Sequence, residues 1–222
     1  MVVFRRTDVG GYFMTTIKFI LIFLSITFCS CGQKNTKDKV DQAAVKFNNS
    51  AMAMVKYLKN ADSSQKAVEL LDSATRLDTN YYLGYFNKLM FLNSLKQYDK
   101  AILTTQNLIR LRPDAHDLYI IGGVFCEKNY DTISSKKYFQ KSLEICDVVL
   151  DTMSFKNNDY EMIMTNKAVN LIMLNRNAEA NALLKKLGET QSDGTMKKIT
   201  LSLMGLNKNQ LIEMYYSDKN SR

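Results

Sequence analysis

Two stretches of the sequence decide the fold: QYDKAILTTQNLIRLRP at residues 97–113 and YDTISSKKYFQKSLEI at residues 130–145. Their small and apolar residues coincide when the chain is shifted against itself by 34 residues, and SSQKAVELLDSATRLD at residues 63–78 fits the same frame. The positions that recur at this interval are Ala67, Ala101 and Ser135; Leu58, Leu92 and Cys126; Leu77, Leu111 and Ile145; Ala74, Leu108 and Ser142; and Tyr85 and Tyr119. Within each stretch, apolar residues stand three and four positions apart, which is typical of an amphipathic helix. The sequence therefore predicts a repeated helical unit.

This pattern resembles the tetratricopeptide repeat family, whose repeat also has 34 residues. Ser135, Phe139 and Ser142 match the small, aromatic and small positions of that family's second helix, and Pro113 matches the Pro that often ends its repeat. The resemblance implies contiguous units at 48–81, 82–115 and 116–149. A fourth unit fits 161–194 after an insertion, and the residues that recover the frame there are Ala168, Leu171, Leu174, Ala180 and Leu184.

We therefore predict an all-α solenoid of about four helix-turn-helix repeats over residues 42–194, with C-terminal capping helices and a tail in 195–222. One Pro in 222 residues favours helices joined by short polar turns. The insertion near 148–160 is predicted to lengthen a helix and its loop. Predicted helix starts are Asp62 or Ser63, and Asn158 with Glu161 as a capping box; predicted breaks are Asn80, Pro113-Asp114 and Gly188.

The first thirty residues are predicted to be a signal peptide. The apolar run FILIFLSITF at residues 19–28 is shorter than the roughly 20 residues needed to span a bilayer, and Lys18 flanks it. Met14 opens a compact signal peptide by itself, so residues 1–13 are interpreted as an upstream start extension.

The end of this run resembles the lipobox of bacterial lipoproteins, in which a small residue precedes the Cys that is lipidated. Ser30 before Cys31 fits that pattern, and Cys29 is the second candidate. The resemblance implies a lipid anchor at Cys31, a polar tether over 31–41 and an outer-membrane lipoprotein facing the periplasm or the cell surface. An ordinary cleaved signal and an uncleaved anchor are the alternatives.

Composition argues against several functions. The net charge of +8 comes from scattered lysines and forms no basic stripe, so no nucleic acid is expected as a partner. With one His, His116, and no catalytic or phosphate-binding motif, we expect no enzyme activity, no cofactor and no metal site. His116 is expected to be an exposed residue near a helix cap, and Cys126 and Cys146 are expected to be buried free thiols. Gly122-Gly123 indicates a close helix contact.

The resemblance also implies a concave groove lined by the first helix of each repeat. The predicted groove residues are Met52, Lys56, Phe86, Met90, Asn93, Ile120, Val124, Glu127, Thr165, Val169 and Met173. One interpretation is a groove for an amphipathic helix, with methionines providing adaptable contacts. The other is that these side chains are core, buried by the superhelix or by the C-terminal caps.

The first functional hypothesis is a membrane-tethered, non-enzymatic scaffold that binds another envelope protein. The second is a glycan- or peptide-binding component of an outer-membrane uptake or assembly system. A continuous apolar trough would favour a protein helix, whereas polar groups with exposed aromatic rings would favour a glycan.

Overall fold

The computed structural model describes residues 40–155, 159–191 and 194–213, and these residues form helices with no strand among them. Four antiparallel helix pairs follow one another along the chain, and two short helices follow them. The helices are α2 (Gln42–Met52), the 3-10 turn η1 (Val55–Tyr57), α3 (Ala61–Leu77), α4 (Tyr82–Ser94), α5 (Tyr98–Leu111), α6 (His116–Lys128), α7 (Thr132–Thr152), α8 (Tyr160–Met173), α9 (Asn177–Thr190), α10 (Thr195–Leu203) and α11 (Lys208–Leu211).

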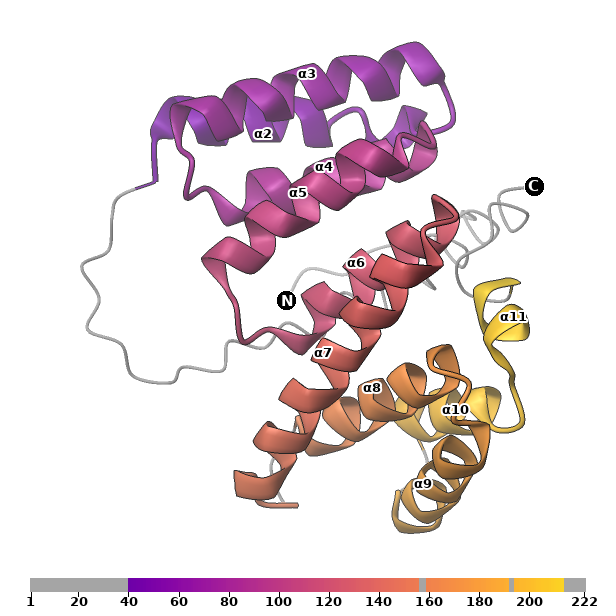
Figure 1. Cartoon of the computed structure of the whole chain (residues 1–222). Coiled ribbons are helices and arrows are strands. Elements are labelled where there is room, and N and C mark those ends of the chain that lie inside the picture. The colour runs from indigo at the N-terminus through magenta and orange to yellow at the C-terminus, as the bar shows by residue number, and fades with distance from the viewer. Residues whose placement is uncertain (1–39, 156–158, 192–193, 214–222) are drawn as a thin grey trace, which may run out of the picture.

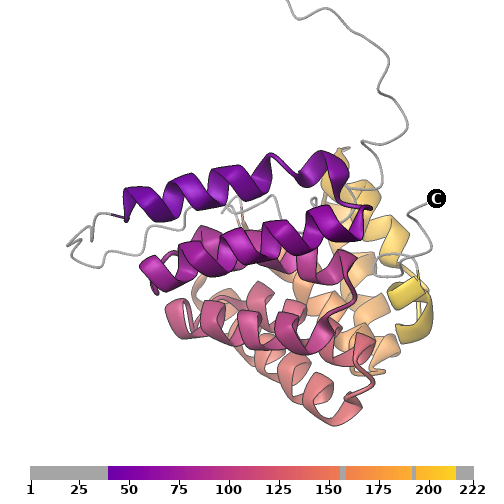
Figure 2. The same cartoon turned by 90° about the horizontal axis from the view of Figure 1, so that it is seen from above.

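The helix pairs stack in sequence order, from α2 and α3 at one end to α8 and α9 at the other (Figures 1 and 2). From α2 to α9, each helix packs mainly against the one before it and the one after it, whereas α11 packs against α8. In Figure 1, the second helices α3, α5 and α7 lie in front of the first helices α2, α4 and α6. The protein is an all-α solenoid with a tetratricopeptide-like helical repeat.

The 34-residue interval is visible in where the helices begin. Helices α4 and α6 begin at Tyr82 and His116, and each has 13 residues. Helices α5 and α7 begin at Tyr98 and Thr132, which repeats the same interval. The second and third helix pairs therefore share one geometry, at the boundaries that the repeat pattern predicted.

The turn between the two helices is also repeated in the second, third and fourth pairs. Lys96, Tyr130 and Asn175 have positive φ angles of 56°, 61° and 60°. In each case the amide of the following residue donates a hydrogen bond to the carbonyl oxygen five residues back, as in Gln97 to Leu92. This left-handed ending is the Schellman motif. Three non-glycine residues adopt it, so no glycine marked these turns in the sequence.

The small residues predicted at the helix crossings are buried. Ala67, Ala101, Ser135 and Ala180 have no exposed surface. The last three are each the fourth residue of α5, α7 and α9, whereas Ala67 is the seventh residue of α3, which begins earlier in the repeat frame. Large apolar side chains from neighbouring helices pack around them in two clusters. One cluster spans α2 to α6 and the other spans α6 to α11, so α6 contributes to both.

Gly122 and Gly123 lie in the middle of α6, where α7 passes closely. A Cβ atom added at Gly123 would lie 2.7 Å from the ring of Phe139, and one at Gly122 would lie 2.8 Å from the ring of Tyr138. The close helix contact predicted from this dipeptide is confirmed.

The first helix pair departs from the repeat frame. Helix α2 begins at Gln42, capped by Asp41, and ends at Met52, where η1 follows. The hydroxyls of Ser64 and Ser94 both donate to the carbonyl oxygen of Leu58, at 2.8 and 2.5 Å, and so fix this irregular turn.

Three local predictions need correction or stay untested. Helix α3 is capped by Asn60 rather than by Asp62 or Ser63. Gly188 lies inside α9 and does not end it. Asn158 lies outside the described residues, and Asp159 is the residue that precedes α8.

The insertion near 148–160 lengthens a helix, as predicted. Helix α7 has 21 residues, whereas its counterpart α5 has 14. Across this longer helix runs a buried polar chain, in which the Asn170 Nδ2 donates to the Ser142 Oγ at 2.8 Å, and that hydroxyl donates to the His116 backbone oxygen at 2.8 Å. These residues belong to α8, α7 and α6.

Candidate functional site

The first helices α2, α4, α6 and α8 present the face on which the groove was predicted, and we call it the first-helix face. A side-chain bond joins its first two helices, because the Asn87 Nδ2 donates to the Asn48 Oδ1 at 2.8 Å. The predicted groove residues lie along this face, but they fall into two halves with different surroundings.

In the N-terminal half, the predicted residues are partly accessible. Met52, Phe86, Met90 and Asn93 are half-buried, and Lys56 is exposed. The rings of Phe86 and Tyr82 stack with centroids 5.9 Å apart. This half therefore offers a partly accessible apolar and aromatic surface to which a partner could bind.

The edges of that surface are polar. The Asn93 Oδ1 accepts a hydrogen bond from the Lys128 Nζ at 2.8 Å, so the ends of α4 and α6 are joined. At the other end, the Arg112 guanidinium lies 4.1 Å from the centre of the Tyr82 ring. An arginine over an aromatic face is a cation–π contact. The surface is thus apolar in its middle and cationic at both ends.

In the C-terminal half, the predicted groove residues are core. Ile120, Val124, Val169 and Met173 are between 3% and 5% exposed and belong to one hydrophobic cluster with Leu203 and Leu211. Thr165 is also buried, and its hydroxyl donates to the Glu161 backbone oxygen. These side chains are not an open groove, because the C-terminal helices cover them.

Glu127 joins this covered half to the C-terminal segment. Its Oε1 lies 2.6 Å from the Lys208 Nζ and accepts a hydrogen bond from the Ser135 hydroxyl at 2.5 Å. The Glu127 side chain is only 10% exposed and that of Lys208 is 20% exposed. An ion pair with so little solvent around it is stronger than one at an open surface.

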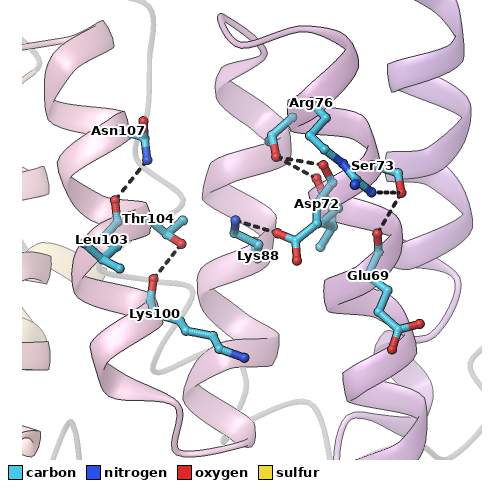
Figure 3. A network of polar contacts seen from close by, with 11 residues as sticks. Glu69, Asp72, Ser73, Arg76, Lys88, Lys100, Leu103, Thr104 and Asn107 are labelled. Atoms are coloured by element: carbon cyan, nitrogen blue, oxygen red, sulfur yellow. Dashed lines mark hydrogen bonds and ion pairs between the residues drawn. The ribbon is translucent and has the colours of Figure 1, made fainter.

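A hollow lies beside α3, and none of the predicted groove residues lines it. It has a volume of 830 Å³, and its lining residues are Phe47, Lys66, Glu69, Leu70, Asp72, Ser73, Thr75, Arg76, Thr79 and Tyr85. Its charged residues are of both signs. The Lys88 Nζ bonds the Asp72 Oδ1 at 2.9 Å, and the Arg76 guanidinium bonds the Ser73 hydroxyl (Figure 3).

Several polar side chains in this region form hydrogen bonds or ion pairs within the protein. Figure 3 shows Thr104 and Asn107 of α5 bonding to carbonyl oxygens of their own helix. Glu69 forms a 3.4 Å ion pair with Lys66. Both carboxylates that line the hollow, those of Glu69 and Asp72, are therefore paired with a lysine.

Cys126 and Cys146 are buried free thiols, as predicted. Burial, aided by nearby carboxylates, raises the pKa of Cys126 to about 11 and that of Cys146 to about 12. A thiol that stays protonated is a poor nucleophile and a poor metal ligand. Over the described ranges, no group of three or more His, Cys, Asp or Glu side chains could hold a metal ion.

His116 is less accessible than predicted. It is half-buried at the start of α6, and burial lowers its pKa despite the neighbouring Asp117. The prediction of an exposed histidine was wrong because α7 covers this end of α6, where the Ser142 hydroxyl reaches the His116 backbone oxygen.

The predicted signal peptide, the anchor candidates Cys31 and Cys29, and most of the tether lie outside the described residues. Within the part of the chain that the structure covers, no helix is long and apolar enough to cross a membrane.

Sequence reasoning missed the role of Lys208 and Leu211. The stretch NQLIEMYY was predicted to form a capping helix, and α11 does lie there, against α8. The sequence contains no signal for the contact between Lys208 and Glu127, because the two residues are 81 positions apart and each is an ordinary charged residue.

Comparisons with known proteins leave the family open. No family model matches the chain, and no curated protein matches it. Among solved structures, one titled "MamA RS-1 ArsTM double mutant" is similar, with 13% sequence identity and a TM-score of 0.44. The match covers 70% of this chain and 99% of that one.

Proposed function

We propose that the protein is a membrane-tethered, non-enzymatic scaffold that binds another envelope protein through the N-terminal half of the first-helix face. The observation that carries this proposal is the contrast between the two halves. The C-terminal half is closed by the chain's own helices, whereas Met52, Phe86 and Met90 stay partly accessible on α2 and α4.

The chemistry of this surface favours an amphipathic helix as the partner. Methionine side chains are flexible and polarisable, so they adapt to apolar partners of different shape. The Tyr82 and Phe86 rings add a stacked aromatic pair, and aromatic residues contribute strongly to interface energies. A glycan is the weaker candidate, because the Arg112 guanidinium already lies over the Tyr82 ring.

Replacing Phe86 with Asp should remove the partner from pull-downs made with envelope extracts. A charge in the middle of an apolar contact removes a central anchor, and such anchors are worth about 2 kcal/mol or more, or roughly 30-fold in affinity. The measurement is quantitative mass spectrometry of captured proteins. Leu103→Asp is the matched control, since Leu103 is 60% exposed on α5. Equal capture of every protein by wild type and Phe86→Asp, with unchanged circular dichroism, would contradict the proposal.

The tether is tested separately. Cys31→Ala should move the protein from the membrane fraction to the soluble fraction, because acyl chains hold a soluble domain at about 0.8 kcal/mol per buried CH₂. Cys29→Ala is the control and should leave the protein in the membrane fraction. If both variants stay with the membrane, an uncleaved apolar anchor replaces the lipid anchor.

A further inference from the structure

The C-terminal segment, defined here as residues 204–213, lies on the first-helix face rather than only at the end of the stack. Most contacts in the solenoid join consecutive helices. Lys208, in contrast, reaches Glu127 of α6, which is 81 residues earlier. The segment therefore occupies the position on α6 and α8 that a bound partner would take if the groove were open.

Lys208 and Leu211 hold the segment in this position, together with Leu206 and Ile212, which are partly buried and pack against the same hydrophobic cluster. Leu211 has no exposed surface and lies in one cluster with Ile120, Val124 and Val169. Lys208 places its ammonium 2.6 Å from the Glu127 carboxylate. The spacing of three residues puts both side chains on one side of a single helical turn.

The exposed residues of the segment contribute little to this contact. Met204, Gly205, Asn207, Asn209 and Gln210 are exposed. The turn of α11 is held internally by a capping box between Asn207 and Gln210. The chain enters through Gly205, whose φ of 78° suits a glycine, and the Gly205 amide bonds the Asn181 Oδ1 at 2.9 Å.

We propose that the C-terminal segment is an internal pseudo-ligand, and that the C-terminal half of the first-helix face binds partner helices of the same chemistry. The partner segment carries a Lys or Arg three residues before a Leu or Ile. The cation pairs with Glu127, and the apolar side chain enters the cluster of Ile120, Val124, Val169 and Met173. This inference goes beyond the proposed function, because it assigns a second binding surface to the same face, and binding there requires displacement of the C-terminal segment.

The charge of the face supports this occupant over a neutral or acidic one. Glu127 is the carboxylate that meets the segment, and its side chain is only 10% exposed. A buried carboxylate without a cation is strongly disfavoured. An acidic segment would also repel it, so the face selects a basic and apolar helix.

The test uses the full-length protein and a fluorescein-labelled peptide with the sequence of residues 204–213, followed by fluorescence anisotropy. The opened variant carries Lys208→Glu and Leu211→Asp. It should bind the peptide at least tenfold more tightly than wild type, whose own segment competes. The control carries Lys198→Glu and Leu201→Asp, which repeat the same changes at the same spacing on exposed positions of α10. The control should bind as weakly as wild type.

Charge exchange tests the specificity. A peptide in which Lys208 is replaced by Glu should lose at least tenfold in affinity for the opened variant, and Glu127→Lys in that variant should restore its binding. Lys208→Glu alone, which leaves Leu211 in place, should raise peptide affinity about threefold and keeps the test valid if the double variant loses its fold. Equal affinity of wild type, Lys208→Glu and the opened variant would overturn the proposal.

Two further outcomes distinguish this inference from dimerisation of the protein and from the proposed function. Wild-type protein that elutes as a concentration-dependent dimer, and loses that dimer on Lys208→Glu, would assign the face to a second copy and overturn the partner proposal. Phe86→Asp should leave peptide affinity of the opened variant unchanged. Peptide binding without any Phe86-dependent partner would therefore reject the proposed function alone, whereas Phe86-dependent capture without peptide binding would reject the pseudo-ligand alone.

Discussion

Phe139→Ala is expected to lower the free energy of unfolding by about 3–5 kcal/mol, the range for a buried phenylalanine that leaves a cavity. Phe139 has no exposed surface and lies in α7 where the ring meets α6 at Gly123. Urea unfolding followed by circular dichroism measures the change. Tyr130→Ala is the control, because Tyr130 is 92% exposed and its loss should change stability by less than about 0.5 kcal/mol. A loss below 1 kcal/mol for Phe139→Ala would show that this contact is not tightly packed.

Gly123→Ala should also destabilise the protein, although alanine is the better helix former by about 1 kcal/mol. The added methyl would lie 2.7 to 2.9 Å from three atoms of the Phe139 ring, and overpacking of this kind costs about 1–3 kcal/mol. The contact is tighter than real Cβ atoms tolerate, so we expect the cost to exceed the gain, with a net loss of up to about 2 kcal/mol by the same urea measurement.

Gly188→Ala is the matched control and should have the opposite sign. Gly188 also lies within a helix, but the nearest atoms to its added Cβ are 3.8 and 3.9 Å away. The substitution should therefore stabilise the protein by about 1 kcal/mol. Stabilisation by both substitutions would mean that α6 and α7 can move apart without loss.

The repeat was predictable because helix crossings require small residues at fixed intervals. Ala67, Ala101 and Ser135 marked three crossings, and the helices that contain them lie as the 34-residue frame requires. The first hairpin was harder to place. Its irregular turn depends on two serine hydroxyls that reach the Leu58 carbonyl from α3 and α4, and hydroxyl contacts of that kind leave no periodic signal.

The candidate site was only half predictable. An apolar stripe at helical spacing has the same appearance whether it is core or groove. Ile120 and Val169 are core because they belong to one hydrophobic cluster with Leu203 and Leu211, which are far from Ile120 in the sequence and belong to the short C-terminal helices. For Phe86 and Met90 no such cover lies over the described face, and they remain the accessible part of the predicted set.

The buried chain from Asn170 through Ser142 to the His116 carbonyl has a consequence for the fourth hairpin. Where α7 is longer than its counterparts, the even spacing of the repeat no longer sets how far α8 should slide along it. Apolar surfaces tolerate such sliding, but an amide sealed inside the protein must meet its partner. Asn170 is fully buried, so a shift of α8 by one helical turn would leave its side-chain amide without the Ser142 hydrogen bond. These three residues therefore fix the axial register of the last hairpin at the one place where repetition could not.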